Sequence, residues 1–276
     1  MLRSPRRPAA SSRHFCQLHN KSKFKTGEYM TVLVLGATGA TGKLVVKQLL
    51  DRGERVKAIV RFLEKLPEAV RSHENVSIIT VGNILRISRS EMAEYLEGCD
   101  AVISCLGHNL TLRGIFGPPF RLVTDATVLI CTAVEESESK KAMKYILMNT
   151  TGHRNRDLGE SPSPAEKCVL GIIGLLVPPQ KDNEKAAEYL RVKIGQSNRK
   201  LEWIAVRPDT LYNMDEVSDY SVYPSPVRSP VFNPGKTSRI NVAHFMAELI
   251  GSEELWKKWK GQMPVIYDSD SLPEKR

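Results

Sequence analysis

A glycine-rich turn between an apolar run and an amphipathic segment is the feature of this sequence that most restricts its fold. The apolar run is Thr31–Leu35, the turn spans residues 36–42 (GATGATG), and residues 41–52 follow with apolar side chains at helical spacing. A strand joined to a helix by such a turn opens a βαβ unit, in which the helix amino terminus offers unpaired N–H groups to phosphates. The turn therefore predicts a dinucleotide-binding site. The residues of the turn expected to contact the ligand are Gly36, Thr38, Gly39, Ala40, Thr41 and Gly42.

Each glycine of this turn has a separate expected role. Gly36 can adopt backbone angles that bulkier residues avoid. Gly39 lets the chain approach a pyrophosphate closely, and Gly42 lets the helix pack tightly on the strand. The alternative interpretation is a glycine-rich turn that binds nothing.

Strand-like and helix-like segments alternate along the rest of the chain, which favours a parallel sheet. We expect a Rossmann-type α/β fold, a doubly wound parallel sheet of about seven strands with a small C-terminal substrate or lid portion. Its ligand would lie beyond the strand carboxyl ends, where the first and fourth strands are neighbours. The expected strands are residues 31–35, 56–60, 76–80, 101–104, 144–148, 201–206 and 264–267. The expected helices are residues 41–52, 63–70, 91–96, a helix within 121–136, 182–195 and 242–249.

The first 29 residues differ in composition from the rest. Residues 1–27 hold seven of the 40 basic residues and no acid, together with several serines and two prolines. This composition is typical of a mitochondrial or plastid transit peptide, and the alternatives are a disordered basic tail, a vector-derived leader or a misassigned start. We expect residues 30–276 to form one NAD(P)-binding domain with an insertion at 152–181, in the cytoplasm or, with a transit peptide, in an organelle.

Charge and cysteine content argue against several classes of function. Without residues 1–27 the chain carries 33 basic and 31 acidic residues, so a nucleic-acid partner is not expected. The five cysteines lack metal-ligand spacing, so we expect free thiols and no metal. No apolar run reaches the roughly 20 residues that span a bilayer. We expect a small-molecule substrate and a monomer or homodimer.

The end of the second expected strand bears on the choice of cofactor. An acid at this position would bind the ribose 2′-hydroxyl of NAD. This chain has Arg61 there instead, and a guanidinium pairs well with a 2′-phosphate. Arg61 therefore favours NADP(H) over NAD(H), and the alternative is a solvated surface arginine.

Several segments together resemble the atypical short-chain dehydrogenase/reductase superfamily, the NAD(P)H-binding group that includes NmrA-like proteins and biliverdin reductase B. The matching segments are residues 36–42, 59–61, 82–83, 104–107, 201–208 and 238–243. The resemblance covers residues 31 to about 267 and implies further cofactor contacts from Asn83, Leu106 and Gly107. Asn83 and Asn241 stand where the family often has Asp. Asn83 can still bind an adenine edge, whereas we expect Asn241 to hold local structure.

Several residues are candidates for a catalytic role. Orthodox members of the superfamily use a Tyr-x-x-x-Lys pair, whose lysine lowers the pKa of the tyrosine. Tyr189 and Lys193 match this pair, but only 18 residues separate Tyr189 from Arg207, which is short by the family pattern. Without the tyrosine, we expect Thr150 or Thr151 to bind a carbonyl oxygen and Lys185 to bind the nicotinamide ribose. Other candidates at the strand carboxyl ends are His108, Asn109, His153 and Lys181. Each of these residues also has a purely structural interpretation.

The apolar stretch 165–177 lies where a substrate lid would be expected. An apolar lid favours a lipophilic or aromatic substrate, and the alternatives are a buried packing helix or an oligomer contact. We therefore expect an NADPH-dependent oxidoreductase that transfers hydride to a small apolar carbonyl, quinone or flavin-like acceptor. The alternative is a non-catalytic NADP(H)-binding regulator or assembly factor of the NmrA type, and an epimerase or dehydratase is a third possibility.

Overall fold

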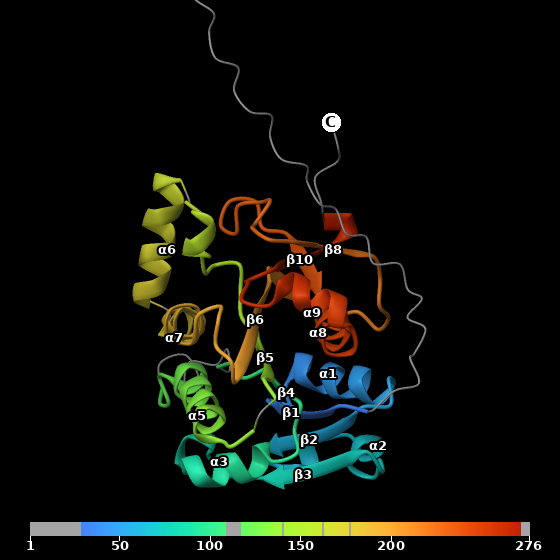
Figure 1. Cartoon of the computed structure of the whole chain (residues 1–276). Helices are drawn as coiled ribbons and strands as arrows, with labels where there is room; N and C mark the ends of the chain where they lie inside the picture. Colours follow the sequence, from blue (N-terminus) through green and yellow to red (C-terminus); the bar gives the residue numbers. More distant parts are fainter. Residues whose placement is uncertain (1–28, 109–116, 140, 162, 177, 272–276) are drawn as a thin grey trace, which may run out of the picture.

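An eight-stranded sheet forms the centre of the molecule (Figure 1). The structure is a computed structural model that describes residues 29–108, 117–139, 141–161, 163–176 and 178–271. The strand order is β3-β2-β1-β4-β5-β6-β10-β8, and every neighbouring pair except β10 and β8 is parallel. The strands are β1 (Thr31–Leu35), β2 (Arg55–Val60), β3 (Val76–Thr80), β4 (Ala101–Ser104), β5 (Met143–Met148), β6 (Leu201–Pro208), β8 (Tyr220–Tyr223) and β10 (Val265–Asp268).

Helices cover both faces of this sheet, as the crossovers of a doubly wound fold require. The α-helices are α1 (Ala40–Leu50), α2 (Glu68–Arg71), α3 (Arg89–Leu96), α5 (Leu122–Glu136), α6 (Pro164–Leu176), α7 (Pro178–Tyr189), α8 (Arg239–Gly251) and α9 (Glu253–Trp259). Short 3₁₀ or π segments are η1 (Leu63–Lys65), η2 (Ile84–Arg86), η3 (Arg156–Leu158), η4 (Leu190–Ile194) and η5 (Ser269–Ser271). Helices α3, α5 and α7 lie on one face, and α1, α8 and α9 lie on the other (Figure 1). The α/β doubly wound prediction is confirmed.

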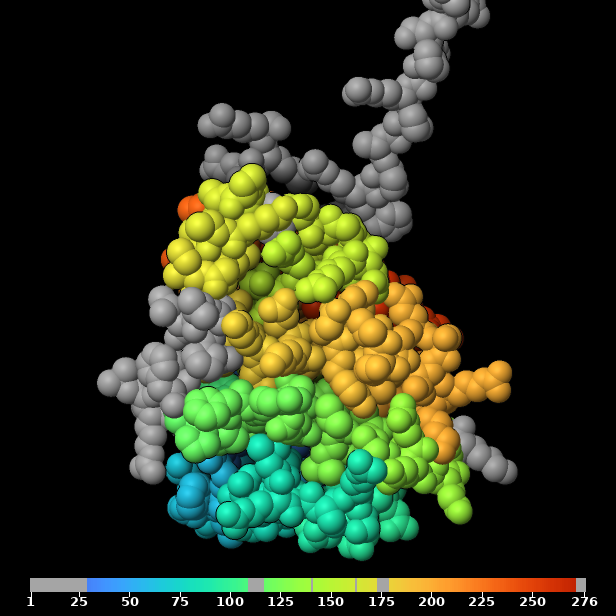
Figure 2. Space-filling view, turned by 90° about the vertical axis from the view of Figure 1, so that its left-hand side faces the viewer, coloured from blue at the N-terminus to red at the C-terminus, as the bar shows by residue number. Residues whose placement is uncertain are grey.

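Each face of the sheet buries its own apolar core, because alternate strand residues point to opposite sides. On the face of α1 and α8, Val32 and Val34 pack with helix residues such as Phe245. On the face of α3, α5 and α7, Leu33 and Leu35 pack with residues such as Ile130. Figure 2 shows this second face, with α3 below, α5 above it and residues from 150 onward at the top. A strand such as β1, with apolar and buried residues at its last four positions, therefore lies in the interior of a sheet that is covered on both faces.

The C-terminal half contains elements that periodicity did not indicate. Strand β8 pairs antiparallel with β10 and closes one edge of the sheet. Strands β7 (Thr210–Tyr212) and β9 (Lys236–Ser238) form a separate parallel pair. Helix α8 begins at Arg239, earlier than its apolar pattern implied, because the Ser238 hydroxyl accepts a hydrogen bond from the Asn241 backbone N–H at 3.3 Å. The Asn241 side chain donates to Asp268 at 2.8 Å and to Ser218 at 2.9 Å, a structural role.

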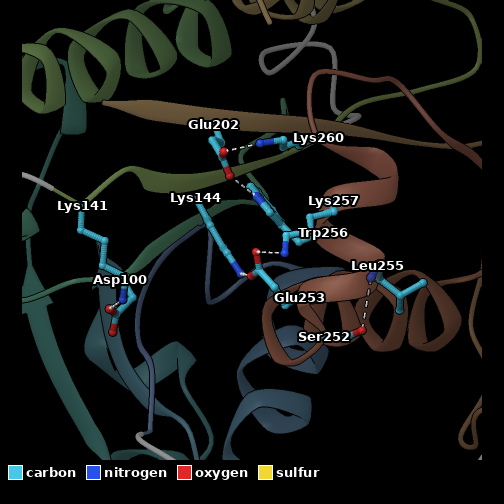
Figure 3. A network of polar contacts seen from close by, with 10 residues as sticks. All are labelled: Asp100, Lys141, Lys144, Glu202, Ser252, Glu253, Leu255, Trp256, Lys257 and Lys260. Carbon is cyan, nitrogen blue, oxygen red and sulfur yellow. Dashed lines mark hydrogen bonds and ion pairs between the residues drawn. The ribbon is translucent and has the colours of Figure 1, made fainter. Parts of the chain in front are cut away.

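A polar network joins α9 to the edge of the sheet at which the parallel strands begin (Figure 3). The Lys144 ammonium pairs with Glu253 at 3.1 Å and lies 5.0 Å from the centre of the Trp256 ring. Glu202 accepts hydrogen bonds from the Trp256 indole at 2.5 Å and from Lys260 at 2.7 Å. These contacts dock α9 against the amino ends of β5 and β6. The carboxyl ends lie at the other edge, and the candidate site is there.

Candidate functional site

The neighbouring ends of β1 and β4 define the position of the site. The strand order runs from β1 outward to β3 on one side and from β4 outward on the other, so the topology switches between β1 and β4. Gly36 follows β1 with φ +74°, and a methyl group placed on it would lie 2.6 Å from the Cys105 carbonyl oxygen. A larger residue at 36 would therefore push apart the chain segments that leave these two strands.

The glycine turn leaves the amino terminus of α1 open to a ligand. Gly39 and Ala40 are exposed, Thr38 is half-buried, and Thr41 is buried. No side chain caps this helix, and its first turn holds no acid. The N–H groups and the positive end of the helix dipole are therefore available to an anion. Gly42 has a different role, because a Cβ on it would lie only 2.1 Å from the Gly36 carbonyl oxygen.

The four other residues predicted to bind the cofactor lie along the same edge of the sheet. Arg61 is exposed directly after β2. The Asn83 side chain accepts a hydrogen bond from the Leu85 backbone N–H at 3.0 Å, which caps η2 and leaves its amide N–H group to serve a ligand. Gly107 is exposed just beyond β4, next to the half-buried Leu106. A groove of about 670 Å³ begins at the end of β3. Its lining residues are Thr80, Val81, Gly82, Asn83, Arg86, Ile87, Glu91 and Tyr95.

The two threonines after β5 lie in a segment that is held by hydrogen bonds. The Thr150 hydroxyl accepts from the Gly152 N–H at 3.3 Å. Thr151 is buried, and its N–H donates to the Pro208 carbonyl at 3.1 Å. The Thr151 hydroxyl also hydrogen-bonds Asp209, whose pKa is raised by burial and lowered in part by its hydrogen bonds. Thr150 is the more accessible of the two.

His153 is buried in the same segment. Its Nε2 lies 2.9 Å from the Gln180 carbonyl oxygen, and its Nδ1 contacts the Asn149 side chain. Burial lowers the pKa of His153 to about 4, with a smaller contribution from the nearby Arg207 charge and against the opposing effect of the Gln180 hydrogen bond. His153 therefore joins the end of β5 to the start of α7 as a neutral ring.

A buried ion pair fixes the chain that follows. The Arg207 guanidinium is fully buried and forms two hydrogen bonds with the Glu160 carboxylate, both 2.8 Å long. It also donates to the carbonyl oxygens of Met263, His153 and Pro224. Because a guanidinium presents its donors in a fixed planar fork, this one side chain sets the path of residues 153–160 across the end of β6.

His108 and Asp182 form a second buried pair, between β4 and α7. His108 Nε2 lies 2.8 Å from Asp182 Oδ2, and the side chains are 5% and 0% exposed. The carboxylate also accepts the backbone N–H groups of Val123 and Thr124 at 2.8 and 2.9 Å. His108 was predicted as a candidate site residue from the sequence, but Asp182 was not. The two residues are 74 positions apart, so no local sequence pattern indicates that they form a pair.

Tyr189 and Lys185 both lie on α7, but in different surroundings. Lys185 is exposed, one turn beyond Asp182. Tyr189 is half-buried beside Thr132 of α5, and burial raises the pKa of its phenol. Asp182 accepts hydrogen bonds from Val123 and Thr124 in the first turn of α5, whereas Thr132 lies about 12 to 14 Å further along that helix at 1.5 Å per residue. The Tyr189 phenol therefore lies toward the strand amino ends, well away from the glycine turn.

The described residues show no arrangement for a metal ion and no membrane-spanning helix. Among them, no group of three or more His, Cys, Asp or Glu residues is arranged to hold a metal ion. No helix within the same residues is long and apolar enough to cross a bilayer. Asn109 and the basic segment 1–28, to which two of the sequence-based predictions refer, lie outside the described residues.

A family assignment agrees with this geometry. Residues 36–253 match the NAD(P)H-binding family, and this segment begins at the first glycine of the turn and covers most of the chain. The chain belongs to the NAD(P)H-binding family. A nicotinamide cofactor is therefore common to the family and to this chain, and the recognised resemblance is confirmed.

Two relatives show how far sequence similarity extends. An uncharacterised chloroplastic protein of Arabidopsis thaliana is 27% identical over 230 residues, which is 81% of this chain and 72% of the relative. The photosystem II assembly factor Ycf39 of a Synechocystis strain is 27% identical over 172 residues, which is 56% of this chain and 50% of that protein. This chain thus spans half the length of Ycf39.

The fold itself is shared with solved structures. The oxidoreductase ylbE from Lactococcus lactis superposes with a TM-score of 0.62 at 18% identity, covering 87% of this chain and 91% of that one. Similarity at this level of identity shows the Rossmann-like fold alone.

Proposed function

We propose that this protein is an NADPH-dependent oxidoreductase that reduces a small, apolar carbonyl, quinone or flavin-like acceptor. The observation that carries the proposal is the open amino terminus of α1, with exposed Gly39 and Ala40 and no acid in the first turn, at the topological switch of the sheet. When bound there, a reduced nicotinamide supplies a hydride to the acceptor. The residues of this chain bind and orient the two molecules and exclude water.

The preference for NADPH rests on Arg61. Its guanidinium is exposed at the end of β2, where acids select the free ribose of NADH. The Arg61→Glu variant should reverse the preference, because a carboxylate repels a 2′-phosphate and accepts the 2′-hydroxyl. Fluorescence titration with NADPH and NADH measures this, with Arg55→Glu, an exposed arginine at the start of β2, as a matched control. An unchanged ratio of dissociation constants for Arg61→Glu would contradict the phosphate-binding role.

Helix α6 supports an apolar acceptor. It lies at the carboxyl edge beside α7 (Figure 1), and Ile172 on it is 52% exposed. Its Glu166 carboxylate contacts the Ser229 hydroxyl of the loop after β8. In the proposal α6 is the lid over the substrate, and Ile172 is one of the apolar residues that it presents.

Thr150 is the proposed contact for the acceptor oxygen, and Lys185 the proposed contact for the nicotinamide ribose. Thr150 is favoured over Thr151 because the Thr151 hydroxyl already bonds the half-buried Asp209 carboxyl group and the Thr151 backbone N–H donates to the Pro208 carbonyl. Thr150→Val should reduce turnover about tenfold, the loss of one hydrogen bond of about 1.5 kcal/mol, while Thr151→Val should mainly lower stability.

The similarity to Ycf39 favours a second candidate function, a cofactor-binding assembly factor. In that case NADPH would change how a partner protein binds, and no acceptor would be reduced. The two functions are separated by measuring NADPH oxidation with a panel of quinones, flavins and enones alongside NADPH binding. Turnover of any acceptor above the uncatalysed rate supports the reductase, whereas tight binding without turnover supports the assembly factor.

The proposal also covers the cellular compartment of the protein and its oligomeric state. One relative is a chloroplastic protein, which favours a plastid among the compartments considered. We propose a monomer or homodimer, which light scattering of the purified protein measures directly.

A further inference from the structure

A histidine–aspartate pair lies at the carboxyl edge of the sheet, and no step of the proposed function yet uses it. His108 comes three residues after Cys105, whose carbonyl oxygen meets the glycine turn at Gly36. Three residues of chain span at most about 11 Å. His108 therefore lies within reach of a molecule that binds across the switch between β1 and β4.

The pairing with Asp182 fixes how the His108 ring can act. An ionised carboxylate only accepts hydrogen bonds, so Nε2 must carry the proton at the 2.8 Å contact. That assignment leaves Nδ1 as the nitrogen able to exchange a proton with a bound molecule. Within the described residues Nδ1 has no hydrogen-bond partner, and 5% of the side chain is exposed. A carboxylate behind an imidazole also stabilises the ring when it is charged.

The position of Asp182 is itself held from three sides. The carboxylate accepts the N–H groups of the first turn of α5, and its backbone carbonyl accepts the Thr124 hydroxyl at 2.9 Å. The residue after it is tied to the end of β5, because the Asn149 side chain donates to the Asn183 carbonyl at 3.0 Å. His153 fixes the Gln180 carbonyl in the same way. A carboxylate supported so completely places its partner ring in one orientation.

We propose that His108, oriented by Asp182, is the proton donor of the reaction. This inference rests on the proposed reductase function. The acceptor gains a hydride, supplied by the nicotinamide, and the proton that the doubly protonated His108 ring carries on Nδ1, so that a quinone or carbonyl oxygen becomes a hydroxyl group. The ring is left neutral with its remaining proton on Nε2, and Nδ1 then takes up a new proton from the solvent. Asp182 is a positioning residue, since it touches His108 and not the acceptor.

Two acceptors that differ in their need for a proton separate this role from a structural one. Menadione gains a hydride and a proton, whereas the N-methylacridinium cation gains only a hydride. His108→Gln should lower the rate with menadione by about 100-fold, the contribution of a positioned general acid, and leave the rate with N-methylacridinium nearly unchanged. His73→Gln, which removes a histidine near α2, is the matched control and should change neither rate.

The result that overturns the proposal is a His108→Gln variant that keeps the wild-type ratio of the two rates. Wild-type protein that oxidises NADPH with neither acceptor contradicts the proposed function instead, so the two failures differ. A measurement without turnover then decides about His108. In ¹⁵N NMR spectra of the wild type with NADP⁺, adding 1-naphthol as an analogue of the reduced product should shift the Nδ1 resonance of His108. An unperturbed Nδ1 at saturating 1-naphthol overturns the inference whether or not the variants fold.

Discussion

Replacing Gly39 with alanine should weaken cofactor binding while leaving the fold intact. Gly39 has φ −74° and ψ 166°, angles that any residue adopts, so alanine brings no backbone strain. Its Cβ would meet only the Gly36 carbonyl oxygen, at 3.1 Å, and a shift of a few tenths of an ångström relieves this contact. Glycine and alanine differ by less than about 1 kcal/mol at such a position, so the free energy of unfolding should change little.

The loss should appear in the binding of NADPH. The added methyl group projects from the exposed start of α1, where a pyrophosphate would approach the helix N–H groups. A hydrogen bond to a charged group contributes about 1.5 to 3 kcal/mol, so losing one raises the dissociation constant about 10- to 100-fold. Fluorescence titration with NADPH measures the dissociation constant, and urea denaturation measures stability.

Two further glycines serve as controls for this experiment. Gly251→Ala places a Cβ where nothing lies within 4 Å and should change neither quantity. Gly42→Ala places a Cβ 2.1 Å from a backbone oxygen and should destabilise the protein itself. If Gly39→Ala binds NADPH as tightly as the wild type, the pyrophosphate does not lie against the start of α1, and the reasoning is refuted.

Three other outcomes follow from the buried groups. Glu160→Gln should lower the free energy of unfolding by about 3 kcal/mol, because it leaves the buried Arg207 charge without its counterion; a loss below about 1 kcal/mol in urea denaturation would contradict this. His153 is neutral when folded, with a pKa of about 4, so the unfolded chain binds a proton below pH 6.5 that the folded chain does not. Wild-type stability should thus fall by about 1.4 kcal/mol per unit between pH 6.5 and 4, relative to His153→Gln, and parallel curves for the two proteins would argue against it. Tyr189→Phe should keep turnover within about twofold, and a loss of 100-fold would restore the phenol as the catalytic acid.

The sequence predicted the parts of this fold that depend on local signals. The seven parallel strands and the adjacency of β1 and β4 follow from apolar runs separated by helical patterns. The four-residue strand β8 was missed because it is short and is followed directly by prolines at 224 and 226. Strand β8 also pairs antiparallel with β10 at the edge of the sheet, and no local sequence pattern indicates this pairing.

The site was less predictable because its decisive contacts join distant segments. His108 and Asp182 are 74 residues apart, and Arg207 lies 47 residues from Glu160. Neither acid has neighbours in the sequence that distinguish it from a surface carboxylate. Conversely, Tyr189 and Lys193 match a catalytic motif in spacing, yet the parallel course of α5 and α7 carries the phenol away from the glycine turn. Spacing along a helix fixes which residues share a face, but not how far along the sheet that face lies.

The tight contacts inside the glycine turn have a consequence for how this family changes over evolutionary time. Gly36 and Gly42 are required by backbone atoms of the protein itself, whereas only Gly39 faces space that a ligand would fill. A descendant that had stopped using nucleotides would still be selected to keep the first and third glycines simply in order to fold. Loss of cofactor use should therefore first be visible as drift at the middle glycine.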